Sequence, residues 1–384
     1  MAQSSSYDVA VIGAGVFGAW TAWHLAQRGL KTLVLEAYGP AHMRASSGGE
    51  TRIIRMSYGA DEIYTRWSLR SLAQWKALSA SSGLQLFQQT GVLWMEGQDI
   101  GRLQDSLVTL ARCGVAHEEM DNAALSRRYP QVNFEGVNRA LLEPDSGVLL
   151  ARRGVQTVLA EAKEKGVEFR ISQVAFPGGS GPLAEIATSA GETFSASQFV
   201  FACGPWLGKV FPELLGNRIF PTRQEIFFFG TPAGDARFAA PSLPTWLFNN
   251  DEVYGMPDIE SRGLKVARDA HGDRVDPDTQ SRTASAEGAK WASNYVSRRF
   301  PALKNAPITE TRVCQYENTS NGDFLIDRHP DMPNVWLAGG GSGHGFKHGP
   351  AFGEYLAGLV CGEEKAEPRF SLASKATEQK RAVY

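Results

Sequence analysis

The fold of this 384-residue chain is decided close to its start by the stretch DVAVIGAGVFG, which occupies positions 8–18. The short apolar run at 8–12 predicts a buried parallel strand. The glycines that follow fit the pattern GxGxxG, in which each glycine has its own task. Gly13 makes a tight turn, Gly15 lets the backbone approach a pyrophosphate, and Gly18 lets the next helix pack closely on the strand. The stretch therefore predicts a dinucleotide-binding turn.

The residues after this turn complete a strand–helix–strand unit. The pattern predicts a helix up to about Gln27 and a second buried strand at 31–35, which ends in Glu36. The amino end of the helix offers free N–H groups and the positive end of its dipole to phosphates. Glu36 is placed to accept a hydrogen bond from a ribose hydroxyl. An ordinary glycine-rich turn is the alternative, but the strands, helix and acid around the motif favour a nucleotide site.

Length and composition favour two domains and a small-molecule partner. A chain of 384 residues is too long for one simple domain, and a formal net charge of -2 gives no reason to expect a nucleic-acid or membrane partner. No run of about 18 apolar residues predicts a membrane helix, and the polar start lacks the features of a signal peptide, so we expect a cytoplasmic protein. The four cysteines are far apart and form no CxxC pair, so neither a structural zinc site nor a disulfide scaffold is expected. We expect no metal.

A second glycine-rich segment, GGGSGHG at positions 339–345, follows a predicted buried strand and opens a predicted helix. Such a helix start can place its positive end near the N1–C2=O region of a flavin, where negative charge grows on reduction. A flexible turn is the alternative. This segment near the C-terminus, together with the position of the first motif at the start of the chain, favours FAD over NAD.

The pattern along the chain predicts a discontinuous cofactor domain. Helices are predicted at 61–78, 103–112, 152–165, 284–299 and 350–360, and strands at 167–172, 199–202, 226–229, 246–248 and 335–338. The expected fold class is α/β, with a Rossmann-type FAD-binding domain and a discontinuous substrate domain that holds a mixed or antiparallel sheet. The FAD-binding domain is assigned to residues 1–85, 146–224 and 312–384, and the substrate domain to residues 86–145 and 225–311.

Four segments make the chain resemble the monomeric sarcosine oxidase family, which includes N-methyltryptophan oxidase, pipecolate oxidase and the fructosyl amino acid oxidases. They are 11–18 with Glu36, SSGGETRIIR at 46–55, YGMP at 254–257 with GLK at 263–265, and the segment 314–347, which runs from CQY through DRHP to GHGFK. Their order and spacing fit along nearly the whole chain. The strings RIIR and SGHGFK are specific to this family.

The resemblance implies an FAD that is joined covalently to the protein. Cys314 matches the cysteine that is bonded to the flavin 8α-methyl group, a reaction for which a thiolate is a good nucleophile. A buried, inert cysteine is the alternative. The other positions expected to contact the cofactor are Gly13, Gly15, Val16, Phe17, Gly18, Glu36, Ser46, Ser47, Arg52, Val174, Ala202, Gly204, Gly343, His344, Gly345 and Lys347.

The resemblance also implies roles for basic and aromatic residues. Arg55 and Lys347 match the pair that clamps a substrate carboxylate, for which the arginine offers a two-point fork. Lys265 matches the lysine that lies near flavin N5 and promotes the reaction with oxygen, because a fixed cation stabilises superoxide. The remaining matches are an arginine near the flavin and two tyrosines of the substrate cavity, namely Arg52, Tyr254 and Tyr316.

Two positions depart from the family. Sarcosine oxidases usually carry a histidine at the position of Gly48, and another active-site histidine near Asp269. The absent side chain at Gly48 and the acid at Asp269 would together open the substrate cavity and present an anion to a polar or cationic end of the substrate. These changes favour a substrate larger than sarcosine, such as a glycated or otherwise N-substituted amino acid. An Asp269 that faces solvent is the alternative.

The expected reaction is oxidation of the C–N bond of a secondary amino acid to an imine, which hydrolyses to an aldehyde or oxo acid and an amine, while O2 becomes hydrogen peroxide. The expected partners are a carboxylate-bearing amine and O2, and the protein is expected to be a monomer or a weak homo-oligomer. The alternatives are a fructosyl amino acid oxidase, a flavin oxidase of primary or cyclic amino acids, and a dehydrogenase that passes electrons to another protein. A flavin-binding protein without catalysis would need no carboxylate clamp.

Overall fold

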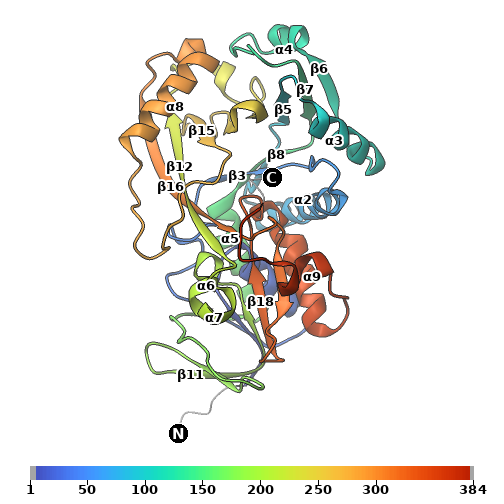
Figure 1. Cartoon of the computed structure of the whole chain (residues 1–384), viewed down its shortest axis with the longest axis vertical. Helices are drawn as coiled ribbons and strands as arrows, with labels where there is room; N and C mark the ends of the chain where they lie inside the picture. Colours follow the sequence, from blue (N-terminus) through green and yellow to red (C-terminus); the bar gives the residue numbers. More distant parts are fainter. Residues whose placement is uncertain (1–5, 381–384) are drawn as a thin grey trace.

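A largely parallel sheet at one end of the molecule is built around β1 (Tyr7–Ile12), the strand that the opening stretch predicted (Figure 1). The computed structural model describes residues 6–380. Strand β1 pairs in parallel with two neighbours, and the sheet order is β17-β18-β11-β1-β2-β9, with β10 paired to β11. The other strands are β2 (Thr32–Glu36), β9 (Glu168–Ile171), β10 (Glu185–Ala187), β11 (Thr193–Phe201), β17 (Leu325–Arg328) and β18 (Val335–Gly339). The predicted Rossmann-type α/β architecture is confirmed.

Helix α1 (Val16–Gln27) has Gly15 as its N-cap residue. The helices α5 (Ala151–Glu164) and α9 (Gly349–Cys361) pack against it. Nine of its twelve residues are buried, because neighbours surround it on most sides. The helices cross closely at Gly353, where an added Cβ would lie 2.6 Å from the carbonyl carbon of Trp20. At Gly18 an added Cβ would lie 1.9 Å from the Gly13 carbonyl oxygen. Only glycine therefore allows α1 to sit this close to its strand.

The second sheet has eight strands in the order β16-β12-β15-β14-β13-β5-β7-β6, and it is antiparallel except for the pair β13–β5. It forms the other end of the molecule, together with α3 (Gly101–Arg112), α4 (Asn122–Arg128) and α8 (Ala286–Arg299) (Figure 1). Its strands are β5 (Val92–Glu96), β6 (Glu118–Asp121), β7 (Arg139–Glu143), β12 (Phe220–Phe229), β13 (Thr245–Phe248), β14 (Val253–Met256), β15 (Leu264–Arg268) and β16 (Ile308–Asn318).

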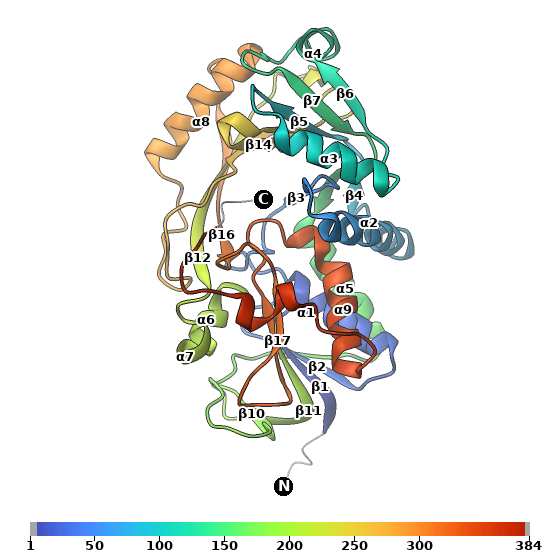
Figure 2. The same ribbon diagram turned by 45° about the vertical axis from the view of Figure 1, so that its right-hand side comes forward.

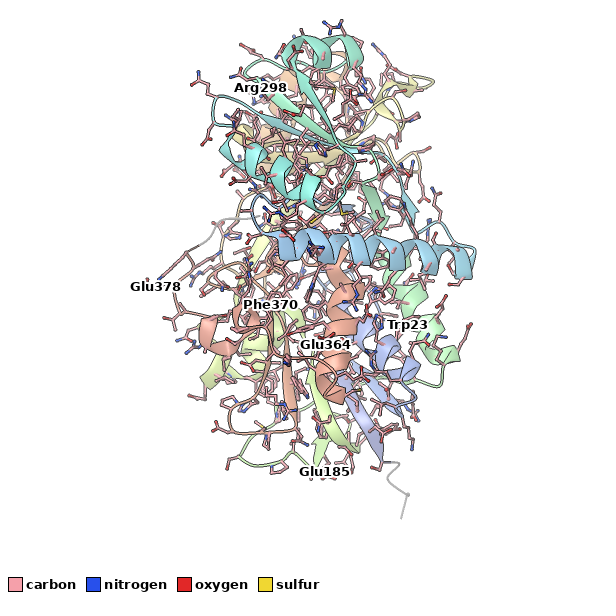
Figure 3. All side chains as sticks on the ribbon, turned by 90° about the vertical axis from the view of Figure 1, so that its right-hand side faces the viewer. Trp23, Glu185, Arg298, Glu364, Phe370 and Glu378 are labelled. Atoms are coloured by element: carbon pink, nitrogen blue, oxygen red, sulfur yellow. The ribbon has the colours of Figure 1, made fainter. Side chains whose placement is uncertain are left out.

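Three features join the two ends of the molecule. The long pair β12–β16 runs from the second sheet toward the first (Figure 2). A small antiparallel sheet combines β3 (Thr51–Ile54), β8 (Gly147–Leu150) and β4 (Phe87–Gln88). Helix α2 (Glu62–Ser82) crosses the middle of the molecule between the two larger sheets (Figure 3). Residues from both ends therefore meet in the centre.

The other elements are short. They are the helices α6 (Leu207–Val210) and α7 (Pro212–Leu215) and the 3₁₀ turns η1 (Gly204–Trp206), η2 (Ala236–Phe238), η3 (Asn249–Asp251), η4 (Pro301–Leu303), η5 (Phe346–His348), η6 (Pro368–Phe370) and η7 (Leu372–Ser374). Across residues 6–380, no helix combines the length and apolarity that a bilayer crossing requires. The assignment of residue ranges to two domains stays a prediction.

Candidate active site

A long cleft opens where the carboxyl ends of β1, β11 and β18 meet. It spans about 1460 Å³ together with the solvent at its mouth. At Gly13, where φ is +104°, an added Cβ would lie 2.4 Å from the carbonyl oxygen of Ala202, so this turn requires glycine. Fourteen of the residues predicted to contact the cofactor line this long cleft: Gly13, Gly15, Val16, Phe17, Glu36, Ser46, Ser47, Arg52, Val174, Ala202, Gly204, Cys314, Gly343 and Gly345.

One end of the long cleft suits the adenosine and pyrophosphate of a dinucleotide. The Glu36 carboxylate accepts hydrogen bonds from the backbone amides of Ala14 (2.7 Å) and Tyr38 (3.0 Å), which fix it at the end of β2. Ser47 Oγ accepts from the amide of Val16 at 3.0 Å and thereby ties a distant loop to the start of α1. Beside this loop, Ser46 Oγ is buried and has no partner among the described residues. The glycine turn, the helix start and the acid together form the donor and acceptor set that such a cofactor needs.

At the other end of the long cleft, an arginine lies beside a cysteine. Arg52 Nη2 is 3.5 Å from Cys314 Sγ and 2.6 Å from the Ser46 carbonyl oxygen, while its Nη1 donates to the Thr51 carbonyl oxygen at 2.8 Å. The contact places a positive charge next to the sulfur. The residues that line the long cleft thus fit an FAD.

A second, inner cavity adjoins the long cleft. It spans about 670 Å³ together with the solvent at its mouth and shares five lining residues with the cleft: Arg52, Cys314, Tyr316, Gly343 and Phe346. Seven of the eight residues predicted for catalysis or substrate binding line it, and Gly48 is the exception. Several residues that the sequence did not predict line it as well. The predicted residues are Arg52, Arg55, Tyr254, Lys265, Asp269, Tyr316 and Lys347, and His344 joins them. The others are Ile53, Gln224, Ile226, Leu247, Met256 and Phe346.

Two buried cations form one wall of the inner cavity. Arg55 and Lys347 are each 4% exposed. The Arg55 guanidinium lies over the rings of Tyr58 (4.2 Å) and Trp94 (4.7 Å) and donates to the Ser57 carbonyl oxygen. Lys347 Nζ donates to Tyr58 Oη and to the His344 carbonyl oxygen, both at 2.8 Å. Burial and the neighbouring Arg55 hold the pKa of Lys347 well below its usual range.

A buried carboxylate stands behind these cations. Glu143, on β7, is 1% exposed and accepts four hydrogen bonds. The donors are the amides of Met56 (2.6 Å) and Ser57 (3.0 Å), Trp94 Nε1 (2.8 Å) and Ser146 Oγ (2.6 Å). Its charge acts on Lys347 in the opposite sense to Arg55 and raises the pKa of that lysine. Glu143 therefore fixes the backbone after Arg55 and offsets part of the positive charge.

Lys265, on β15, lies on another side of the inner cavity. It is 2% exposed, and its Nζ donates to the carbonyl oxygen (3.1 Å) and the hydroxyl (3.2 Å) of Thr51. Burial, reinforced by the charge of Arg52, lowers the pKa of Lys265 to about 7. Its ammonium lies 5.7 Å from the Tyr254 ring centre. Burial likewise raises the pKa of Tyr254 to about 12 and keeps its hydroxyl neutral.

Asp269 follows β15 and lines the inner cavity, so it does not simply face solvent. Its backbone amide donates to the Glu252 carbonyl oxygen at 2.6 Å, which fixes the start of the loop. Burial raises the pKa of its carboxyl, whereas the charges of Arg55, Arg102 and Lys347 act in the opposite sense. The cavity thus holds an acid opposite its two cations.

Four predicted positions lie elsewhere than expected. Gly48 lines neither the long cleft nor the inner cavity, because it packs on the backbone of His42; an added Cβ would lie 2.1 Å from that carbonyl oxygen. The absence of a side chain at this position therefore does not enlarge the cavity. His344 and Lys347 line the inner cavity and not the long cleft, so the structure places them with the substrate residues. Gly18 packs α1 on β1 and does not line the cleft.

Sequence reasoning missed the second layer of residues behind the cations. Tyr58 Oη lies 2.8 Å from Lys347 Nζ, 2.7 Å from His348 Nε2 and 3.2 Å from His344 Nδ1, so it links three side chains. Its position three residues after Arg55 was the available signal. Glu143 was missed because it lies 86 residues or more from the amides it binds, and a local pattern carries no trace of such a contact.

A dinucleotide cleft that opens into a buried, cationic cavity is the arrangement of a cofactor-dependent oxidoreductase that acts on a small anion-bearing molecule. A family model described as "FAD dependent oxidoreductase" matches residues 8–359, and the chain belongs to this family. It is 32% identical over 375 residues to the monomeric sarcosine oxidase of Streptomyces avermitilis, with 95% of this chain and 96% of that protein covered.

The monomeric sarcosine oxidase of Bacillus sp. (strain NS-129) is 31% identical over 374 residues, covering 93% of this chain and 94% of that protein. Among solved structures, L-proline dehydrogenase from P. horikoshii matches with a TM-score of 0.82 at 23% identity, covering 96% of this chain and 97% of that one. The first two likenesses confirm the predicted resemblance, and the third shows the fold.

Proposed function

We propose that this FAD-dependent oxidoreductase oxidises the C–N bond of an N-substituted amino acid. The observation that carries the proposal is the pair of buried cations, Arg55 and Lys347, in a cavity that meets the long cleft at Cys314. A buried pair of positive charges is costly unless an anion joins it, and a substrate carboxylate supplies that anion. The enzymes to which the chain is similar, two sarcosine oxidases, support the same class of substrate.

The residues of the inner cavity bind and orient the amine. Arg55 holds the carboxylate through its planar fork, and Lys347, anchored by Tyr58, supplies a second positive charge. FAD, when bound, supplies the acceptor for the two electrons and the hydrogen that leave the carbon next to nitrogen. The clamp orients that carbon toward Cys314 and Arg52, where the two spaces meet. The product imine then reacts with water to give an aldehyde or oxo acid and an amine.

Two further roles belong to this proposal. Cys314 would hold the flavin through a thioether to its 8α-carbon, and the Arg52 guanidinium lies 3.5 Å from its sulfur. Lys265 provides the fixed cation beside which O2 is reduced to hydrogen peroxide, because its ammonium is held by Thr51 where water is excluded. A cytoplasmic location and a monomeric or weakly oligomeric state stay predictions.

Asp269 favours a substrate larger than sarcosine. Its carboxyl lies in the inner cavity with the two cations, so it suits a substrate with a polar or cationic group beyond its carboxylate. Glycated amino acids and other N-substituted amino acids with a polar end meet this requirement. A cyclic amino acid is the second candidate, because the same fold occurs in an L-proline dehydrogenase.

A substrate panel tests the proposal. Sarcosine, N-methyl amino acids with charged or bulky side chains, fructosyl amino acids, proline and pipecolate are compared by oxygen uptake and peroxide formation. We expect the highest kcat/KM for an N-substituted amino acid that is larger than sarcosine. Sarcosine as the best substrate would remove the role of Asp269, and activity only on primary amines would overturn the proposed function.

A further inference from the structure

A carboxyl group that no mechanism above uses lies in the long cleft. Glu317, near the end of β16, is 5% exposed and lines the cleft together with Gly341. Its Oε1 is buried and has no hydrogen-bond partner among the residues that the structure describes. Buried polar oxygens without a partner are rare in folded proteins, because each costs the hydration it has lost. Because the carboxyl lines the long cleft, a ligand bound there can supply a hydrogen-bond partner to it.

The surroundings of this carboxyl are built to accommodate it. The backbone amides of Gly340 and Gly341 face it, and its own carbonyl oxygen accepts from the Ser342 amide at 2.8 Å. At Gly339 an added Cβ would lie 2.2 Å from Glu317 Oε1, so glycine leaves the space that the carboxyl occupies. Burial raises the pKa of Glu317 to about 8, whereas the two glycine amides act in the opposite sense. The glycine segment at 339–341 therefore holds the carboxyl in place.

The position of Glu317 along the long cleft identifies the part of the ligand that it meets. The glycine turn at Gly13 and Gly15 marks the pyrophosphate, and Cys314 marks the ring system. Glu317 lies three residues beyond Cys314 on the same strand, and its charge acts on Cys203 at the end of β11, next to the glycine turn. It therefore lies between the two ends. In FAD the ribityl chain, with its three free hydroxyls, connects the pyrophosphate to the ring.

Hydrogen-bonding chemistry favours the ribityl chain over the phosphates. Phosphate oxygens only accept hydrogen bonds, so a phosphate could pair with this carboxyl only through the single proton of its neutral form. A hydroxyl both donates and accepts, and it can bond a carboxyl in either protonation state.

We propose that Glu317 is a cofactor-binding residue whose carboxyl group hydrogen-bonds a ribityl hydroxyl of FAD. The proposal rests on FAD binding, which the family establishes, and not on the amine proposed above as substrate. A chain that binds FAD but oxidises a different substrate leaves it intact. It therefore stands or falls separately from the proposed function.

Equilibrium binding of FAD tests this role without any activity measurement. A Cys314→Ala background keeps binding reversible, and apoprotein from riboflavin-limited cells is titrated with FAD by flavin fluorescence. We expect Glu317→Ala to weaken binding about tenfold, as loss of one hydrogen bond to a buried carboxyl predicts. Glu317→Gln keeps an oxygen and is expected to lose less. Glu310→Ala is the matched control, because Glu310 lies on the same strand but outside the long cleft.

FAD analogues that lack the 2′-, 3′- or 4′-hydroxyl identify the partner. The background protein is expected to bind one analogue about tenfold more weakly than FAD, and Glu317→Ala is expected to bind that analogue and FAD equally well. If Glu317→Ala does not fold, the analogue series on the background protein and on Glu317→Gln carries the test. The proposal would be overturned if the background protein bound FAD and all three analogues equally well. It would also be overturned if Glu317→Ala weakened the binding of FAD and of every analogue by the same factor.

Discussion

Arg52 Nη2 lies 3.5 Å from the sulfur of Cys314, although the two residues are 262 positions apart and belong to different sheets. The same nitrogen donates to the Ser46 carbonyl oxygen at 2.6 Å, which holds the guanidinium in place. The fold thus fixes a guanidinium beside the sulfur to which the proposed function assigns the covalent bond with the flavin.

Replacement of Cys314 by serine should release the flavin on denaturation. We expect the wild-type protein to keep its yellow colour in the acid-precipitated pellet, whereas Cys314→Ser leaves the flavin in the supernatant, because a serine hydroxyl is a far weaker nucleophile than a thiolate. Absorbance of pellet and supernatant measures the difference. Cys113→Ser, at a half-buried cysteine on α3's C-cap, is the control and should behave as wild type. Flavin that stays in the Cys314→Ser pellet would contradict the assignment.

Replacement of Lys265 by methionine should slow the reaction with oxygen by about 100-fold, with a much smaller effect on reduction by substrate. The reason is the loss of the buried cation that stabilises developing negative charge on oxygen. Stopped-flow absorbance measures the two half-reactions separately. Lys304→Met, at an exposed lysine, serves as the control. Equal slowing of both half-reactions would exclude a specific role in the oxygen step.

The same lysine should make the stability of the apoprotein depend on pH. Its pKa in the folded state is about 7, below the ordinary value of 10.5, so the unfolded chain binds more protons between these two values. Stability is therefore expected to rise with pH from about 7 to about 10.5. Lys265→Met should be more stable than wild type at pH 6, with a melting temperature at least about 2 °C higher, and this gap should narrow toward pH 10. Thermal unfolding at a series of pH values checks the sign, and a gap that widens with pH would refute it.

Replacement of Arg55 by methionine should lower kcat/KM for a carboxylate substrate by about 100-fold, because a charge-assisted contact in a buried site is lost. The loss should be much smaller for the methyl ester of the same substrate, which has no carboxylate to clamp. Steady-state oxygen uptake with both compounds measures the difference. Arg66→Met, at an exposed position on α2, is the control. An equal loss for acid and ester would argue against a carboxylate clamp.

Replacement of Glu143 by glutamine should destabilise the folded protein by about 3 kcal/mol, because two or more buried donors lose their acceptor and the positive charge of Arg55 and Lys347 is no longer offset. Urea unfolding measures the change. Glu119→Gln, on the exposed side of β6, is the matched control and should change stability by less than about 0.5 kcal/mol. Unchanged stability of Glu143→Gln would mean that the amide satisfies the same donors.

The first strand–helix–strand unit could be predicted from sequence because its signals are local. The local GxGxxG pattern was enough to predict that Gly13 forms a tight turn and that Gly18 lets the helix pack on the strand. At both positions an added Cβ would clash with a backbone carbonyl oxygen, as these predictions require. The strand at 226–229 was predicted too short, since β12 begins at Phe220. Its polar first half is stabilised by the long pairing with β16, and no apolar run marks it.

The inner cavity could be predicted only through the family resemblance, since its walls come from strands that are distant in sequence. Glu143, Tyr58 and Glu317 were not predicted, because each gains its contacts from segments that only the folded chain brings together. Gly48, in contrast, was predicted to lie at the cavity and does not. Its sequence position pointed to the cavity, but the local backbone turns it toward His42.

Strand β16 restricts how this enzyme could acquire new substrates. Strand β12 pairs with this part of β16, where Gln224, Thr222 and Pro221 lie opposite Cys314, Tyr316 and Glu317. Side chains on both faces of this stretch of β16 line the long cleft or the inner cavity. An insertion or deletion of one residue here would exchange the two faces and displace all three side chains at once. Laboratory evolution toward bulkier amines is therefore expected to collect its changes at Leu247 and Met256, on β13 and β14, and to leave β16 untouched.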